Sequence, residues 1–501
     1  MFLNAHYKLA MLAAFFAGLL LPLAFAPFEW ALLAIPLLGI LFYLCQQSTP
    51  RQAWWRGWAF GTGMFLSGTY WVYISMHDFG AVPAIFSVLL TVLFALFLGL
   101  FSAMAAWLSV RFFPGVDRLR LLLVFPTIWV LLEWVRSWFF TGFPWLNLGV
   151  SQSGSPLAGY ASIIGEFGIS WLLAFTSAGL VFLLQSGMKS RITLILLITS
   201  FWWGGYHLKQ YEWTQPVGEP FSVAMVQGNV DQNIKWDPDH RVKIITSYLE
   251  LSRSHWDADL MIWPETAISA FYHHVPEVVD TLEQLAREQK TDMLVGIPYR
   301  NLDTRDYYNS VLSLGGERQF YHKRHLVPFG EFIPFQDLIS DVLDFMGLPM
   351  SSFSQGLALQ PPLKAGGYLA GLTVCYEIIF NSEVIQSLPK ANYLVNVSNN
   401  TWFGDSSMPF QQLQMAQLRA LETQRYVLSA TNNGVSAVVD HEGKIIARSP
   451  QFQTHVLRAN VQARQGATPF VGYGNIPIIS FLFIAAIFAV CANRHYLARS
   501  S

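Results

Sequence analysis

The sequence is poor in charged residues, and this shortage argues against a fully water-soluble protein. Of its 501 residues only 13% are charged, whereas 53% are hydrophobic. An average soluble protein carries roughly a quarter charged residues, so this chain is not water-soluble along its whole length. The net charge of −1 offers no basic surface, and we therefore expect no nucleic acid partner.

Motifs for metals and nucleotides are also missing from the sequence. The 12 histidines form no HExxH or similar cluster, and no pair of cysteines offers ligands, so we predict no metal site. No glycine loop of the phosphate-binding Walker type is found, so ATP is not implied. We accordingly expect an activity that needs no cofactor.

Long apolar runs occupy the first part of the chain and its end. A helix needs about 20 mostly apolar residues to cross a bilayer. Eight runs approach that length: 9–27, 30–46, 57–75, 82–108, 119–140, 162–185, 192–208 and 476–493. We predict a seven-span transmembrane domain over 1–210, an α/β domain over 215–470, and a C-terminal transmembrane helix with a cytoplasmic tail over 476–501.

The first apolar run has some features of a signal peptide. Lys8 precedes it, and Ala24-Phe25-Ala26 resembles a small-x-small cleavage site. Pro27 would follow the cut directly, however, and further apolar runs come immediately after it. We therefore interpret this run as a retained membrane anchor.

The short loops between the predicted spans differ in basic residues, which indicates their orientation. The loops near 26–29, 76–81 and 141–161 contain none, whereas the loops and ends on the other side contain ten: Lys8, Arg51, Arg56, Arg111, Arg118, Arg120, Lys189, Arg191, Arg494 and Arg499. Basic loops stay in the cytoplasm. Residues 215–470 are therefore predicted to face outward, which in a Gram-negative cell is the periplasm.

Cysteine is scarce, and one cysteine stands apart from the other two. Cys45 and Cys491 fall in predicted spans, so Cys375 has no disulfide partner in the polar domain. A lone thiol in an oxidising compartment suggests a nucleophile. Taken without its neighbours, a buried apolar cysteine is about as frequent an explanation.

The segment 215–470 has the alternation typical of an α/β fold. Helical patterns near 238–255, 276–290 and 410–425 lie between some of six strand-like segments: 221–227, 259–263, 292–297, 368–375, 393–398 and 435–440. This pattern predicts a sandwich in which helices cover buried sheet faces. Three titratable residues lie at or just beyond strand ends: Glu265, Lys323 and Cys375.

The local motifs of these three residues carry a family resemblance. Glu265 lies in WPET, Lys323 in YHKRHLVPFGE and Cys375 in LTVCYE, and together they resemble the Glu-Lys-Cys triad of the nitrilase superfamily. Nearly the whole chain is similar to the apolipoprotein N-acyltransferases, on the predicted spans and on TGFPWLNLG (141–149), PFGEFIP (328–334), SNNTWFG (398–404) and QLRALETQRYVLSATNNG (417–434). The resemblance implies a nitrilase-like αββα sandwich inserted into a membrane domain of about eight spans.

Each of the three residues alone would more often be an ordinary loop residue, but the constellation favours catalysis. Cys375 suits a nucleophile that forms a thioester, Glu265 can accept its proton, and Lys323 can stabilise the oxyanion. The resemblance places Glu331, Glu377 and Tyr376 near the site as supporting residues, although Glu331 and Glu377 could be surface or loop-capping carboxylates. Because these carboxylates disfavour a thiolate, we expect Cys375 to rest as a thiol.

The resemblance also implies the substrates and the cellular place. The donor would be a membrane phospholipid, with phosphatidylethanolamine suggested, and the acceptor the diacylglyceryl-modified N-terminal cysteine of an apolipoprotein, in the bacterial inner membrane. Four aromatic residues are candidate substrate contacts, with plain packing as an equal alternative for each: Trp236, Trp145, Phe143 and Trp402. Asn400-Thr401 stands where Asp-Ala is usual in the family, so any role of that acidic side chain is in doubt here.

Some features leave alternatives open. Glu133 and Arg136 are spaced to pair on one helix face, and their role is either structural or functional. A membrane-tethered amidase or nitrilase that passes its acyl group to water would have the same triad, but it would not need eight spans. A transporter or lipid-binding protein is disfavoured by the few charges inside the spans and by the lack of a repeat between groups of spans.

Overall fold

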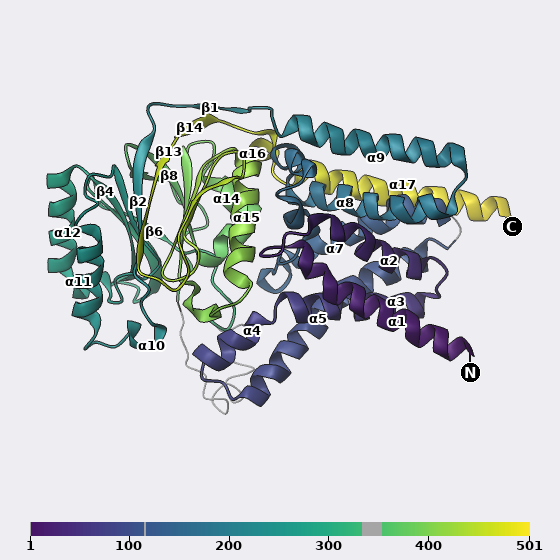
Figure 1. The fold of residues 1–501 in the computed structure, drawn as a ribbon, viewed down its shortest axis with the longest axis horizontal. Helices are drawn as coiled ribbons and strands as arrows, with labels where there is room; N and C mark the ends of the chain where they lie inside the picture. The colour runs from purple at the N-terminus through teal and green to yellow at the C-terminus, as the bar shows by residue number, and fades with distance from the viewer. Residues whose placement is uncertain (1, 115–116, 333–352, 501) are drawn as a thin grey trace. The chain divides into compact units, whose positions relative to one another are not determined.

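The computed structural model describes residues 2–114, 117–332 and 353–500, and the chain forms two compact units (Figure 1). The first comprises Met1–Tyr73, Ala84–Tyr211 and Gly472–Ser501, and the second comprises Ile74–Pro83 and Glu212–Val471. The first unit is helical, and the second is built on β-sheets.

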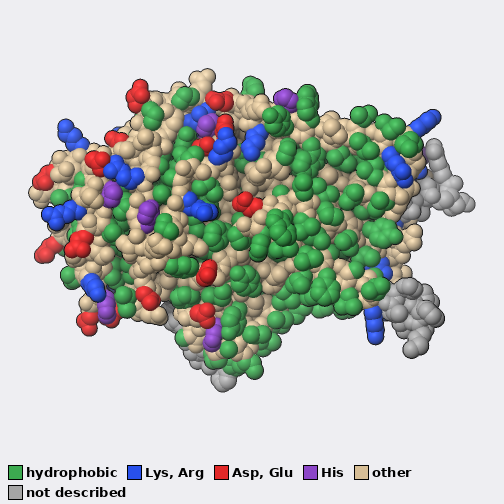
Figure 2. All heavy atoms as spheres, in the orientation of Figure 1, with side chains coloured by type: hydrophobic (Ala, Val, Ile, Leu, Met, Phe, Trp, Pro, Cys, Tyr) green, Lys and Arg blue, Asp and Glu red, His purple; other side chains and the backbone are tan. Residues whose placement is uncertain are grey.

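The first unit consists of α-helices joined by turns and by longer segments that contain 3₁₀ helices. Its helices are α1 (Phe2–Leu20), α2 (Ala34–Gln46), α3 (Pro50–Gly68), α4 (Trp71–Ile74), α5 (Ala84–Phe112), α6 (Asp117–Leu119), α7 (Phe125–Arg136), α8 (Ala161–Gln185), α9 (Met188–Leu208) and α17 (Ile476–Ser500). Hydrophobic side chains cover most of the visible surface of these helices, and charged ones gather on the second unit (Figure 2). Such an apolar exterior is typical of a membrane protein.

Four helical stretches of the described chain are long and apolar enough to cross a membrane: Tyr7–Ala24, Ala84–Phe112, Pro156–Gln185 and Ile476–His495. The other four predicted spans also fall on helices, but α2 and α7 are shorter and α3 and α9 are less apolar. The predicted number of eight spans is therefore not confirmed. The span predicted over 57–75 is shifted, because a Thr49 capping box with Pro50 starts α3 earlier and Thr69 ends it.

The second unit contains two six-stranded sheets. Their strand orders are β13-β2-β3-β4-β5-β6 and β12-β11-β10-β9-β8-β7. The strands are β2 (Phe221–Gln227), β3 (Leu260–Trp263), β4 (Asp292–Arg300), β5 (Tyr307–Leu314), β6 (Gln319–His322), β7 (Leu363–Ala365), β8 (Tyr368–Val374), β9 (Tyr393–Ser398), β10 (Val427–Thr431), β11 (Ala437–Val439), β12 (Ile445–Arg448) and β13 (His455–Val461). Strands β2, β3 and β4 run parallel, as do β8, β9 and β10.

Helices cover the outer faces of both sheets. The helices of this unit are α10 (Gln232–Lys235), α11 (Arg241–Ser252), α12 (Pro276–Gln289), α14 (Asn381–Val384) and α15 (Met408–Thr423), with α16 (Pro469–Tyr473) at its end. Figure 1 shows α11 and α12 beside one sheet and α15 beside the other. The nitrilase-like sandwich of sheets and helices predicted for this segment is what the structure contains.

Two hydrophobic cores hold these layers together. One core joins the facing sheets through residues such as Met225 and Ile262 from one sheet and Val374 and Val395 from the other. The second lies between the first sheet and α11 and α12. Because the inner strands are buried on both faces, most of their residues are hydrophobic, and β2 and β9 were predicted at their observed bounds.

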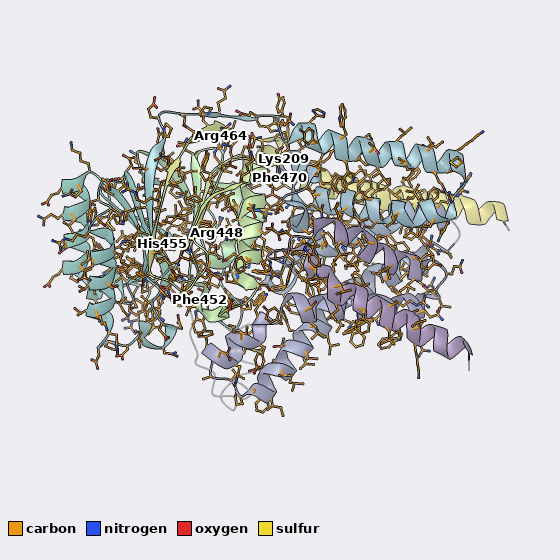
Figure 3. The ribbon with its side chains drawn as sticks, viewed as in Figure 1. Lys209, Arg448, Phe452, His455, Arg464 and Phe470 are labelled. Atoms are coloured by element: carbon orange, nitrogen blue, oxygen red, sulfur yellow. The ribbon has the colours of Figure 1, made fainter. Side chains whose placement is uncertain are left out.

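The segments that lead into and out of the region 212–471 of the second unit lie side by side. Strand β1 (Thr214–Pro216) pairs antiparallel with β14 (Arg464–Gly466), with Thr214 opposite Gly466. Arg464, labelled in Figure 3, donates from Nε to Thr214 Oγ1 at 2.8 Å and from Nη2 to Glu212 Oε2 at 3.0 Å. The two ends of this unit are therefore fastened to each other.

Candidate active site

Glu265 lies in a tight turn that follows β3. Thr266, the next residue, has a φ of +48°, which is uncommon for a β-branched residue. The turn passes directly over Gly296, where a Cβ atom would come within 2.1 Å of the Pro264 carbonyl oxygen and 2.8 Å of the Glu265 Cα. Only glycine therefore allows the turn to approach β4 so closely.

Both carboxylate oxygens of Glu265 are held by hydrogen bonds. The Asn309 side-chain amide donates to Oε1 at 2.7 Å, and the backbone N–H of Asn399 donates to Oε2 at 2.7 Å. The residue is only 7% exposed. Its carboxylate is thus fixed in one orientation, as a general base must be.

Lys323 follows β6 and is completely enclosed. Its Nζ lies 2.8 Å from both carboxylate oxygens of Glu331 and 3.9 Å from Glu265 Oε1. Burial lowers the pKa of its ammonium, but the negative charges of Glu331 and Glu265 outweigh that effect, so the pKa of Lys323 is raised. The side chain is therefore a fixed positive charge at neutral pH.

Cys375 lies at the end of β8, where the chain turns sharply. Its φ is +53°, in the left-handed region, and its carbonyl accepts a hydrogen bond from Gln412 Nε2 at 2.9 Å. Burial and the negative charge of Glu265 raise the pKa of the thiol to about 12, while Lys323 and a hydrogen bond with Ser398 act to lower it. The thiol is thus protonated at rest, as the sequence led us to expect.

The sheet topology explains how these three residues come together. Glu265 follows β3 and Lys323 follows β6 of one sheet, whereas Cys375 follows β8 of the other sheet, which packs face to face with the first through a shared hydrophobic core. Lys323 acts electrostatically on Cys375 and lies against Glu265. The structure therefore brings a carboxylate, a fixed cation and a thiol into one group, in which Glu265 and Lys323 are buried and Cys375 is partly buried.

Glu331 and Glu377 have different surroundings within this region. Glu331 accepts from Lys323, from Asn309 Nδ2 at 3.1 Å and from the Val327 backbone N–H at 2.8 Å. Its contacts thus orient both Lys323 and the amide that holds Glu265. Neither carboxylate is the freely solvated surface group that one reading of the sequence allowed.

Glu377 holds the loop beyond β6 against the turn at Cys375. It accepts from the backbone N–H groups of Val374 at 2.7 Å, Arg324 at 2.7 Å and His325 at 3.1 Å, and from the Tyr321 hydroxyl at 2.9 Å. Burial raises the pKa of its carboxyl against the opposing effect of these hydrogen bonds. Tyr376, between Cys375 and Glu377, is buried and packs edge-on against the His325 ring.

The four aromatic candidates differ in accessibility. In the second unit, Trp236 is 46% exposed directly after α10 and Trp402 is 37% exposed in the turn Asn400–Phe403. In the first unit, Trp145 is 1% exposed, is tilted against Trp71 and stacks on Phe143, which is partly buried. The Trp145 ring is therefore packed inside the first unit and is not exposed at its surface.

Glu133 and Arg136 both bind the loop that follows α7. Arg136 donates to the carbonyl oxygens of Phe143 and Trp145, each at 2.6 Å, and to Asn147 Oδ1 at 2.7 Å. Glu133 Oε1 accepts from the Leu148 backbone N–H at 2.9 Å. These contacts give both residues a structural role in shaping the 143–148 loop.

Three polar residues of the site were not singled out from the sequence. Asn309 bridges Glu265 and Glu331, Asn399 donates to Glu265, and Ser398 bonds the thiol of Cys375. Asn309 lies in a buried strand, where an amide is unfavourable. An asparagine in such a hydrophobic segment could have been recognised as a candidate site residue. The backbone donor at Asn399 leaves no such trace in a sequence.

Comparison with known proteins gives consistent matches along the chain. Residues 17–179 match the model described as the apolipoprotein N-acyltransferase N-terminal domain, and residues 222–470 match the carbon-nitrogen hydrolase model. The apolipoprotein N-acyltransferase of Methylococcus capsulatus is 41% identical, over 98% of this chain and 97% of that protein. The Vibrio cholerae protein of the same name is 40% identical, over 98% of both chains.

Proposed function

This chain belongs to the apolipoprotein N-acyltransferase family, and from that premise we propose that Cys375 carries the acyl group as a thioester between donor and acceptor. The chain is a membrane enzyme whose function is lipoprotein N-acylation. The observation that supports the proposed route is the group formed by the buried Glu265 and Lys323 with the partly buried Cys375. The function then divides into two transfers at one sulfur atom.

In the first transfer, the Cys375 sulfur attacks an ester carbonyl of the phospholipid while Glu265 accepts the thiol proton. Lys323 stabilises the oxyanion that forms, because its charge is already fixed there. The carbon–oxygen bond then breaks, and the departing lysophospholipid oxygen takes the proton from Glu265. The product is an acyl thioester on Cys375.

In the second transfer, the α-amino group of the acceptor attacks the thioester carbonyl and gives a proton to Glu265. The carbon–sulfur bond breaks, and the sulfur regains that proton. An amide and the free thiol result, so the enzyme returns to its initial state. Because the pKa of the thiol is raised, the sulfur takes up this proton again at neutral pH, and each attack needs Glu265 to remove it.

The substrates and the place of the reaction follow the same reasoning. We propose a phospholipid donor such as phosphatidylethanolamine and, as acceptor, the diacylglyceryl-cysteine at the N-terminus of an apolipoprotein. We also propose eight spans in the bacterial inner membrane, seven before residue 210 and one over 476–493, with 215–470 in the periplasm. The exposed Trp236 and Trp402 are the candidates for substrate contact in the second unit.

Mass spectrometry of Cys375 after incubation with a defined phospholipid tests the route directly. With donor and no acceptor, the peptide that contains Cys375 should gain the mass of one acyl chain, and neutral hydroxylamine should remove it. An acceptor peptide with a free amine should discharge the thioester as an amide, whereas an N-acetylated acceptor should not. Turnover without any label on Cys375, or acyl transfer by Cys375→Ala, would refute the thioester. Release of free fatty acid alone would instead indicate a hydrolase.

A further inference from the structure

Lys235 is a buried lysine to which the proposed mechanism assigns no task. It is the last residue of α10, its side chain is 2% exposed, and its Nζ donates to the backbone carbonyl oxygen of Glu265 at 3.1 Å. Burial lowers the pKa of Lys235 to about 8, and the negative charge of Glu265 opposes that decrease. Burying an ammonium is costly, so this contact needs an explanation.

The carbonyl that Lys235 holds lies at the most constrained point of the active-site turn. It belongs to the peptide that joins Glu265 to Thr266, and Thr266 has a φ of +48°. A β-branched residue in this region is strained, and it persists only where the surrounding structure enforces it. A hydrogen bond to this peptide is therefore placed where it keeps the Glu265 turn in its active conformation.

Lys235 also belongs to a loop that is tied to the other side of Glu265. Gln232 accepts from the Asn399 side-chain amide at 2.9 Å, and the carbonyl of Val230 accepts from Asn432 Nδ2 at 2.8 Å. Asn399 is the residue whose backbone N–H donates to Glu265 Oε2. The loop that ends at the exposed Trp236 thus contacts Glu265 twice, directly through Lys235 and indirectly through Asn399.

We propose that Lys235 is a positioning residue for acyl transfer: its ammonium fixes the turn that presents Glu265 and couples that turn to the loop that carries Trp236. This inference rests on the proposed role of Glu265 as the base. Lys235 contributes charge as well as a hydrogen bond. Its ammonium and that of Lys323 both interact electrostatically with the Glu265 carboxylate.

A double-mutant cycle tests the proposal through the rate at which Cys375 is acylated in a single turnover. The full-length protein is compared as wild type, Lys235→Met, Glu265→Gln and the double variant, with phospholipid vesicles as donor. Lys243→Met is the matched control, because Lys243 is exposed on α11. We expect Lys235→Met to slow acylation about 10- to 100-fold, the effect of a small misplacement of a catalytic group, and Lys243→Met to change it less than about twofold.

The cycle separates positioning of Glu265 from an independent effect. In the Glu265→Gln background, Lys235→Met should change the rate less than about twofold, because the base on which Lys235 acts is gone. Two losses that multiply, or a Lys235→Met rate within about twofold of wild type, would overturn the proposal. A Glu265→Gln rate equal to wild type would instead refute Glu265 as the base. This result differs from the two that would overturn the role of Lys235.

The dependence of the rate on pH provides a readout that a merely structural defect would not change. Removing a positive charge beside a carboxylate makes the carboxylate hold its proton more tightly. The acid limb of the acylation rate should therefore move to higher pH in Lys235→Met, whereas a structural defect lowers the rate by one factor at every pH. If Lys235→Met loses its thermal unfolding transition in detergent, Lys235→Gln takes its place, and an unshifted acid limb there would contradict the proposal.

Discussion

Lys323 and Glu331 form a buried ion pair in which the Lys323 ammonium lies 2.8 Å from both oxygens of the Glu331 carboxylate. The same ammonium is 3.9 Å from the nearer oxygen of Glu265. Glu331 is therefore the closer partner and fixes the position of Lys323. The carboxylate of Glu265 is left to its amide donors and remains available to accept a proton.

The first prediction concerns this fixed charge. Lys323→Met should reduce acyl transfer by about 10²–10³-fold or more, which is typical for the loss of one oxyanion donor. Glu331→Gln keeps the shape of the side chain but removes the negative charge that holds Lys323. It should therefore reduce acyl transfer less than Lys323→Met does. Steady-state acylation of an acceptor peptide by folded variants measures both. Near-normal transfer by Lys323→Met would remove Lys323 from the mechanism.

The second prediction separates the ionisation of Cys375 from its acylation. Because the pKa of the thiol is about 12, its alkylation by neutral iodoacetamide should rise about tenfold per unit between about pH 7 and pH 9, without a plateau. Glu265→Gln removes a negative charge that raises this pKa, so alkylation at a given pH should become faster. Acylation by phospholipid should become much slower, because the base is lost.

Peptide-resolved mass spectrometry distinguishes Cys375 from the exposed Cys491 in this measurement. Alkylation of Cys491 serves as the internal control and should be the same in both proteins. A plateau in the alkylation of Cys375 below about pH 9 would show that the thiol ionises more readily than its surroundings imply. Slower alkylation of Cys375 in Glu265→Gln would contradict the conclusion that the negative charge of Glu265 raises the pKa of this thiol.

The third prediction uses two glycines of the second unit. Gly296→Ala would place a Cβ 2.1 Å from the Pro264 carbonyl oxygen, whereas a Cβ at Gly316 would meet no atom within 4 Å. We expect Gly296→Ala to displace the Glu265 turn and to reduce acylation at least about 10²-fold. Gly316→Ala should leave it within about twofold. Equal rates for both variants would mean that the turn tolerates a shift of that size.

The fourth prediction concerns the proposed orientation in the membrane. Reporters fused after Gln210 and after Ser501 should report the periplasm and the cytoplasm, respectively. The reason is the asymmetry of the loops, because basic residues hold short loops in the cytoplasm. A cytoplasmic signal after Gln210 or a periplasmic one after Ser501 would mean that the number of spans is wrong.

Six strands of the second unit were predicted from the sequence, because most of their residues are hydrophobic. Strands β2 and β9 were predicted at their observed bounds, while the strand predicted over 435–440 is shorter, Ala437–Val439. The β1–β14 pair was missed, as were six strands of the two sheets: β5, β6, β7, β10, β12 and β13. Edge strands such as β6 and β13 alternate or mix polar residues, so a short window does not distinguish them from loops.

The candidate site was recognised from local motifs, but its geometry depends on contacts between distant segments. Asn399 is 134 positions from Glu265, and its donor is a backbone N–H, which any residue would offer. Trp145 was chosen as an interfacial aromatic, yet its ring packs in the interior of the first unit. The composition of a loop does not reveal which of its side chains face inward.

The pairing of β1 with β14 has a consequence for how such a chain could arise. Thr214 lies opposite Gly466. The segment of more than two hundred residues between them therefore begins and ends at nearly the same point. Domains with adjacent ends tolerate insertion into another protein, because the host loop need not stretch to accommodate them. A single insertion between α9 and α17 would thus suffice to place this unit in the chain, and neither part would need to change its connectivity.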